Sequence, residues 1–220
     1  GIESFYDDLK GQGEAAVHVD WKPVAGGDKE AAANLRKLKA PELAAKIEAA
    51  NKEALLRILA AKPTIVGLGI AGEEIPGMTK TTILHAGPPV TWERMSGPQR
   101  GAVMGGLIYE GLAKDLAEAE ALAASGKIKF DPCNMHDAVG PMAGVVTYSM
   151  PVWILENKAF GNRAYCTINE GLGKVMRFGG NDAEVLARLG WLRDSLGPAL
   201  GRALRELGGI PLKALVARGL

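Results

Sequence analysis

A segment rich in glycine and proline, residues 84–101, has side chains suited to binding an anion. It begins as a strand that ends in His85, turns through Ala-Gly-Pro-Pro, and enters a glycine-containing helix that carries Arg100. The backbone N–H groups at a helix start, with guanidinium groups such as those of Arg94 and Arg100, bind phosphate or carboxylate. The alternative is an ordinary strand-to-helix connection whose arginines are solvated or paired with glutamate.

A second segment, residues 134–144, places His136 beside Asp137 in a loop with few packing residues. Histidine titrates near neutral pH, so His136 is a candidate for proton transfer. A hydrogen-bonded structural histidine is the alternative. The chain has no HxH or HExxH spacing, and two loop histidines with one aspartate do not make a metal site. We therefore expect neither a metal ion nor a cofactor.

A third segment, residues 156–179, has asparagine, glutamate and arginine in glycine-rich turns that follow strands. Such groups orient a small polar ligand, although hairpin turns also use asparagine and glycine. The candidate binding residues are Asn157, Arg163, Asn169, Glu170 and Arg177. The run GLGK at 171–174 lacks the spacing of a Walker motif. One shared ligand would explain all three segments, so we expect them to converge on one cleft.

The elements that position these residues begin with a small N-terminal α/β piece, residues 1–40. The alternation AAVHVDW at 15–21 predicts a strand, and the glycine loop after it leaves Asp28 placed to cap a helix over 29–38. Strand, glycine loop and helix together suggest half of a nucleotide-binding fold. The glycines do not form GxGxxG, so the pattern does not indicate a dinucleotide site.

Apolar spacing predicts a connecting helix over 41–61, a main α/β unit over 62–180 and a C-terminal helical segment over 181–220. Strands are expected at 63–69, 81–85, 127–130, 143–148, 152–156 and 163–168, and helices at 92–95, 98–112, 114–125, 182–206 and 212–218. Gly197-Pro198 marks a break or kink. The fold class is therefore α/β, of mixed α+β type.

The 98–112 helix has three interior glycines, Gly101, Gly105 and Gly106. Each costs roughly 0.5–1 kcal/mol relative to alanine. We expect this helix to lie close against another backbone or a ligand.

The bulk composition excludes several classes of partner. The chain has 220 residues, with Lys+Arg 26 against Asp+Glu 25, so no field of one sign is available to bind nucleic acid or an anionic membrane. Charged residues interrupt every apolar run, and the first residues do not form a signal peptide. The two cysteines, Cys133 and Cys166, are expected to be buried reduced thiols, which indicates a reducing cytoplasm.

Three long runs of unusual glycine, proline, histidine and tryptophan choices resemble one family throughout. They are VHVDWKPVAGGD, LHAGPPVTWERMSGPQRGAV and HDAVGPMAGVVTYSMPVWILENKAFGNRAYCTINEGLGKVMRFGG. The family is the oxamate carbamoyltransferase subunit family, AllG/YlbE-like, and the resemblance extends from Glu3 to about Leu215. Family chains usually continue into a further, largely helical half, so we expect the C-terminal segment to continue in a half that this sequence does not contain.

The resemblance implies a cytoplasmic subunit of an enzyme that interconverts carbamoyl phosphate plus oxamate with oxalurate plus phosphate, in purine (allantoin) degradation. It implies FdrA-like and other companion subunits in a hetero-oligomer. If the resemblance holds for the reaction, His85 and His136 are candidate catalytic groups. The candidate anion-binding residues are then Arg94, Arg100, Arg163 and Arg177. Two alternatives are a non-catalytic scaffold subunit of that complex and a related carbamoyl or acyl transferase with another small carboxylate or amide substrate.

Overall fold

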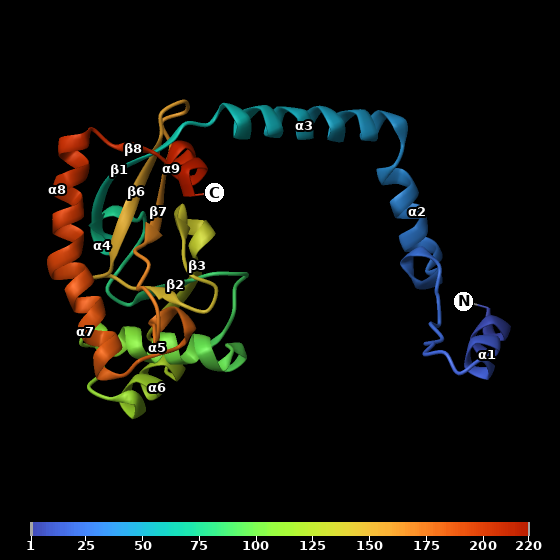
Figure 1. Ribbon diagram of the computed structural model, residues 1–220, viewed down its shortest axis with the longest axis horizontal. Coiled ribbons are helices and arrows are strands. Elements are labelled where there is room, and N and C mark those ends of the chain that lie inside the picture. The colour runs from blue at the N-terminus through green and yellow to red at the C-terminus, as the bar shows by residue number, and fades with distance from the viewer. Residues whose placement is uncertain (1, 220) are drawn as a thin grey trace. The chain divides into compact units, whose positions relative to one another are not determined.

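The computed structural model describes residues 2–219 and divides into two units, residues 1–60 and 61–220 (Figure 1). The mixed α/β class expected from the sequence is confirmed, with helices, a five-stranded sheet and a three-stranded sheet among the described residues. None of the helices in this part of the chain is both long enough and apolar enough to cross a bilayer.

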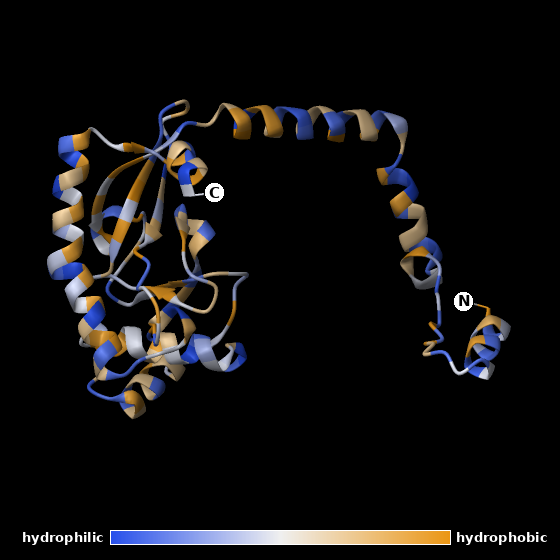
Figure 2. Cartoon of the chain, in the orientation of Figure 1, coloured by the Kyte–Doolittle hydropathy of each residue, from blue (hydrophilic) through white to orange (hydrophobic). Residues whose placement is uncertain are grey.

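The first unit is helical. Its elements are α1 (Glu3–Gly11), the 3-10 helix η1 (Val24–Gly27), α2 (Lys29–Leu38) and α3 (Pro41–Ala60). The predicted cap is confirmed, because the Asp28 carboxylate accepts hydrogen bonds from the N–H groups of Glu30 at 2.8 Å and Ala31 at 3.0 Å. The turns of α3 alternate between hydrophilic and hydrophobic colours in Figure 2, and none of its residues is buried.

The predicted strand at 15–21 is wrong, and with it the half nucleotide fold. No strand is present among residues 2–60, so this alternating segment has no partner with which to form a ladder. Its apolar side chains therefore remain exposed, with Val17 87% and Trp21 72% accessible. An alternating pattern of apolar and polar residues forms a strand only where a second strand can pair with it and its apolar face can pack against other residues.

The second unit contains both sheets. The five-stranded sheet has the order β4-β7-β6-β1-β8, antiparallel except for the parallel pair β4 and β7. The three-stranded sheet has the order β3-β2-β5, with β3 parallel and β5 antiparallel to β2. The strands are β1 (Pro63–Ile70), β2 (Thr82–His85), β3 (Lys129–Pro132), β4 (Ala138–Val139), β5 (Val145–Val146), β6 (Pro151–Asn157), β7 (Arg163–Thr167) and β8 (Ile210–Pro211).

Helices cover these sheets, and α8 lies along β1 at one side of the larger sheet (Figure 1). The helical elements are α4 (Ala71–Glu74), η2 (Trp92–Arg94), α5 (Gly97–Tyr109), α6 (Leu116–Ala124), η3 (Cys133–His136), η4 (Met176–Phe178), α7 (Ala183–Trp191), a π-helical turn (Leu192–Leu196), α8 (Gly197–Leu207) and α9 (Leu212–Gly219). The helix predicted over 182–206 is therefore continuous, and its irregularity is a π turn that ends just before Gly197.

The three-stranded sheet is buried on both faces. Alternate side chains of a strand point to opposite faces. Ile83 and Val145 belong to one apolar cluster, formed with α5, α6 and α7. Leu84 and Val146 belong to the other, formed with β6, β7 and α4. This central sheet therefore fixes the position of the segments that follow β2 and precede β6.

Candidate functional site

A cavity of about 250 Å³ lies between the segment before β6, the loop that follows β7, and the α7 helix with its π turn. Its apolar walls are formed by Val145, Met150, Pro151, Ile168, Met176, Leu189 and Leu192. Polar groups come from Thr167, Asn169, Glu170 and Arg177. A concave, mostly apolar pocket with a few convergent polar groups is the usual form of a small-molecule site.

Arg177 is the cation of this cavity. Its Nη1 donates to Oδ1 of Asn169, and its Nη2 donates to the carbonyl of Gly171 at 2.8 Å. The guanidinium lies over the ring of Phe178 at 5.3 Å. A guanidinium has five N–H donors, and these two bonds leave Nε–H and one hydrogen on each terminal nitrogen for another acceptor. The loop therefore holds Arg177 in one orientation while it keeps donors for an anion.

Glu170 positions the backbone beneath Arg177. Its two carboxylate oxygens accept hydrogen bonds from the N–H groups of Met176, at 2.7 Å, and Arg177, at 3.0 Å. Both oxygens therefore accept a backbone donor within the loop, and such charge-assisted bonds are stronger than neutral ones. Glu170 thus closes the loop from 170 to 177 and makes the cavity wall that carries Arg177.

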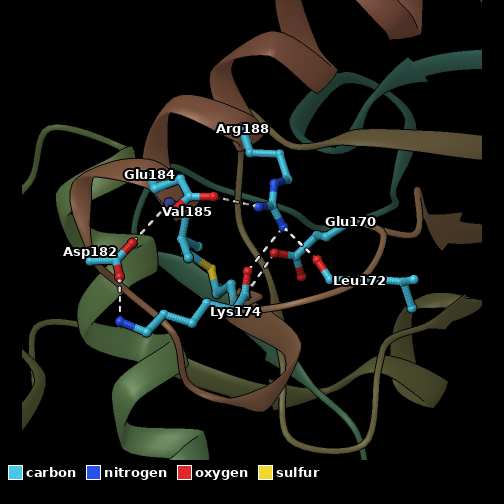
Figure 3. A network of polar contacts seen from close by, with 8 residues as sticks. Glu170, Leu172, Lys174, Asp182, Glu184, Val185 and Arg188 are labelled. Carbon is cyan, nitrogen blue, oxygen red and sulfur yellow. Dashed lines mark hydrogen bonds and ion pairs between the residues drawn. The ribbon is translucent and has the colours of Figure 1, made fainter.

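Helix α7 anchors the outer part of the same loop (Figure 3). Arg188 Nη1 donates to the carbonyls of Leu172 at 3.2 Å and Lys174 at 3.0 Å, and Arg188 Nη2 pairs with Glu184 at 3.0 Å. Lys174 pairs with Asp182 at 3.1 Å, and the Asp182 carboxylate also accepts from Val185 N–H at 3.1 Å.

These bonds lower the pKa of Asp182, the Val185 N–H most and Lys174 next. The sequence interpretation missed Arg188, because its acceptors are main-chain carbonyls that leave no pattern in the sequence.

The glycine-rich helix α5 supports the end of this loop by direct backbone contact, as its glycines predicted. A Cβ at Gly101 would lie 2.5 Å from the carbonyl oxygen of Gly179, and the Asn181 side chain donates to the Gly101 carbonyl at 3.1 Å. A Cβ at Gly105 would lie 2.8 Å from Cβ of Asn181, and one at Gly106 2.8 Å from Thr147 Cγ2. All three glycines are therefore required by close packing.

Neither candidate histidine lines the cavity. His85 is fully buried in β2; its Nδ1 donates to the carbonyl of Ala86 at 2.9 Å, and its Nε2 has no partner among residues 2–219. In His136, Nδ1 contacts the Pro76 carbonyl at 2.7 Å and Nε2 contacts the Asp131 carboxylate at 3.0 Å. His136 therefore ties β3 to the loop before β2, and a catalytic role for either histidine stays a prediction.

The Asp131 carboxylate has two side-chain partners, Lys129 and His136. Hydrogen bonding from Lys129, and more weakly from His136, lowers the pKa of the Asp131 carboxyl group.

Arg100 has structural partners. Its Nε donates to the Trp92 carbonyl at 3.2 Å, its Nη2 donates to the Glu93 carbonyl at 2.8 Å, and its guanidinium lies over the Trp92 ring at 5.1 Å. Arg100 therefore fastens η2 to the first turn of α5, and Arg94 belongs to the same 3-10 helix.

The other two predicted binding residues lie at the β6–β7 hairpin. The side chain of Asn157 accepts from the N–H groups of Lys62 and Ala159, and Arg163 pairs with Glu156 at 3.6 Å. Of the nine predicted residues, the cavity lining includes Asn169, Glu170 and Arg177. Segments 134–144 and 156–179 both contribute residues to the cavity lining, whereas no residue of 84–101 lines it; Gly101 contacts Gly179, outside the lining.

The donors around the cavity do not form a metal site. Among the described residues, no group of three or more histidine, cysteine, aspartate or glutamate side chains is arranged to hold an ion. Both thiols are free, and burial raises the pKa of Cys133 to about 11 and also raises that of Cys166.

Comparison with known proteins relates this chain to one protein family. A family model described as oxamate carbamoyltransferase subunit AllG matches residues 128–220, a range that contains every residue lining the cavity. The chain belongs to the AllG-like family.

Two Escherichia coli proteins and one solved structure are similar to this chain. The chain is 48% identical over its whole length to "Uncharacterized protein YahG", covering 47% of that protein. It is 44% identical over 173 residues, 78% of the chain, to "Oxamate carbamoyltransferase subunit AllG", covering 41% of it. A conserved protein of unknown function from Enterococcus faecalis has a matching crystal structure, with 51% identity and a TM-score of 0.78 over 82% of this chain and 43% of that one. The chain thus spans less than half the length of these relatives.

Proposed function

We propose that this chain is part of a carbamoyltransferase subunit that acts on oxamate, and that the Arg177 cavity binds the small carboxylate substrate. One observation carries the proposal. The AllG family match covers residues 128–220, and the whole lining of the cavity, from Gly140 to Leu192, lies inside it.

The chemistry of the cavity agrees with such a substrate. In the forward direction the oxamate amide nitrogen forms a C–N bond to the carbamoyl carbon, and the C–O bond to phosphate breaks. The phosphate leaves with the electron pair, and the nitrogen loses a proton to a base or to the leaving group. Orienting the nucleophile and withholding water are the contributions that a cavity can make to this step.

The remaining N–H donors of Arg177 suit the oxamate carboxylate, which a guanidinium binds in a bidentate manner. The volume of about 250 Å³ lies below the roughly 300–1,000 Å³ of sites for drug-sized ligands, as a small substrate requires. The apolar wall around Met176 and Leu189 limits the access of water to the bound ligand.

A scaffold role is the second candidate. Its support is that two donors of Arg177 and both oxygens of Glu170 are already bonded within their own loop. In that case the loop serves as a rigid surface for companion subunits, and catalysis belongs to them. FdrA-like partners, a cytoplasmic location and a role in allantoin degradation are part of the proposal in either form. A related transferase with another small carboxylate or amide would use the same cavity.

The test is to co-express the complete protein with its companion subunits and to assay phosphate-dependent cleavage of oxalurate. Loss of one charge-assisted hydrogen bond, worth about 1.5–3 kcal/mol, predicts that Arg177→Gln raises the KM for oxalurate by about 10- to 150-fold. The matched control is Arg36→Gln on α2, an exposed arginine of the other unit, which is expected to leave KM unchanged.

Normal kinetics for the Arg177→Gln complex would favour the scaffold role. A wild-type complex that cleaves no oxalurate at any phosphate concentration would remove the carbamoyltransferase proposal.

A further inference from the structure

A second cavity, of about 240 Å³, lies between the end of β1 and helix α8. One side is formed by residues 68–70, and the other is the helix face that carries Gly201, Arg202 and Arg205. Pro151 belongs to the lining of both this cavity and the Arg177 cavity, and the consecutive residues Leu192 and Arg193 line one each. The two cavities are therefore neighbours that share part of a wall.

The cations of this second cavity differ in their partners. Arg193 is bound by Asp194 through two hydrogen bonds, of 2.7 and 2.9 Å, and it lies over the ring of Tyr109 at 5.4 Å. The side chains of Arg202 and Arg205, in contrast, have neither a hydrogen bond nor an ion pair with any of residues 2–219. They are three residues apart, so they project from the same face of α8. Two uncompensated guanidinium groups thus meet at one concave surface.

Glycine makes the room for this arrangement. A Cβ at Gly201 would lie 3.7 Å from Cβ of Leu68 and 3.8 Å from Nη1 of Arg205. The Arg205 guanidinium therefore lies back across the helix over a position without a side chain. A Cβ at 201 would therefore make ordinary van der Waals contacts, whereas a large side chain such as leucine would extend into the space between the helix and β1.

Among residues 2–219, no carboxylate from the neighbouring elements pairs with Arg202 or Arg205. Asp194 is already committed to Arg193, and Glu206, four residues beyond Arg202, does not pair with it in the described part of the chain. Glu74 approaches β1 at Gly69, where a Cβ would lie 2.8 Å from its Oε1. Leu68 faces Gly201, and successive residues of a strand face opposite sides, so Gly69 and the Glu74 side chain against it lie on the face of β1 away from α8.

We propose that the cleft between β1 and α8 binds a phosphate-class oxyanion through Arg202 and Arg205. Two guanidinium groups one helical turn apart offer donors in two directions. A tetrahedral dianion such as phosphate has acceptor oxygens for both guanidinium groups, whereas a single planar carboxylate can accept from only one guanidinium in a bidentate manner. The site is distinct from the Arg177 cavity, and the proposal does not depend on carbamoyl transfer.

Calorimetric titration of the purified complete protein with inorganic phosphate, at constant ionic strength and without companion subunits or oxalurate, tests the proposal. Because a single charge-assisted hydrogen bond corresponds to about tenfold in affinity or more, Arg205→Gln is expected to weaken phosphate binding at least tenfold. The double variant Arg202→Gln/Arg205→Gln is expected to abolish it, and Arg36→Gln, the exposed control, to leave it intact. Arg177→Gln is also expected to leave this binding intact, which separates the two cavities.

Gly201→Leu provides a second variant that keeps both arginines but fills the space between α8 and β1. We expect it to lose phosphate binding while its circular dichroism stays that of the wild type. Acetate, a monocarboxylate, at the same concentrations is the competing ligand class, and we expect it to bind at least tenfold more weakly than phosphate. Binding of phosphate that survives the double variant, absence of phosphate binding by the wild type, or equal binding of acetate would overturn the proposal.

Discussion

Replacing Glu170 by glutamine tests whether this carboxylate holds the loop that carries Arg177. The glutamine oxygen can still accept one of the two backbone N–H bonds, from Met176 or Arg177, but its amide group then faces the other N–H. One charge-assisted bond is lost and one half-buried N–H is left without an acceptor, at a cost of about 1–3 kcal/mol. We expect about 2 kcal/mol, which corresponds to about 4–8 °C in Tm for a domain of this size.

The matched control is Glu184→Gln, in the same group of contacts in Figure 3. Glu184 is 76% exposed, and its pair with Arg188 is an i,i+4 surface pair, worth about 0.3–0.5 kcal/mol. Thermal and urea unfolding of the wild type and both variants give the comparison. A midpoint for Glu170→Gln within 1 °C or so of the wild type, or an equal loss in Glu184→Gln, would refute the reasoning, because surface charge alone would then explain both changes.

Two further predictions concern the packing of α5 and the reactivity of a buried thiol. Gly101→Ala puts a methyl group 2.5 Å from the Gly179 carbonyl oxygen, so we expect a loss of about 1–3 kcal/mol in unfolding free energy. In the control Gly97→Ala, in the same helix, the methyl group meets nothing within 4 Å and is expected to cost nothing, so equal midpoints of the two variants in thermal unfolding would contradict the prediction. Burial raises the pKa of Cys133 to about 11, so we expect its thiol to react with iodoacetamide at pH 8 about a hundredfold more slowly in the folded than in the unfolded protein, and the rate to rise as the pH approaches 11. Mass spectrometry of the labelled peptide measures the rate, and fast labelling of the folded protein at pH 8 would contradict the prediction, because the thiol would then be accessible and ionised.

Local chemistry predicted the features of this fold that depend on neighbours in sequence. Asp28 caps α2 because an aspartate before a helix accepts from the next N–H groups wherever that helix lies. The glycines of α5 predicted a close backbone approach, because their cost to the helix needs an explanation. The hairpin between β6 and β7 followed from β-branched and aromatic runs around Gly161-Asn162.

Features that depend on distant partners could not be predicted in the same way. The alternation at 15–21 is as regular as that of a true strand, but pairing requires a second strand that residues 2–60 do not supply. Arg100 was expected to face an anion, because a cation is unfavourable in the first turn of a helix. In the structure, the Arg100 guanidinium donates hydrogen bonds to two carbonyl groups of η2 and makes a cation–π contact with the Trp92 ring.

The π turn at Leu192–Leu196 sets the rotational phase between α7 and α8. An α-helix rotates about 100° and rises about 1.5 Å per residue, and a π turn accommodates one residue more than an α turn. If the same residues instead followed regular α-helical periodicity, without the π turn, the face of α8 would be rotated by about 100° relative to α7. Leu189 would still face the first cavity, but Arg202 and Arg205 would leave the second. One extra residue thus allows a single continuous helix to serve two cavities that regular α-helical geometry would separate.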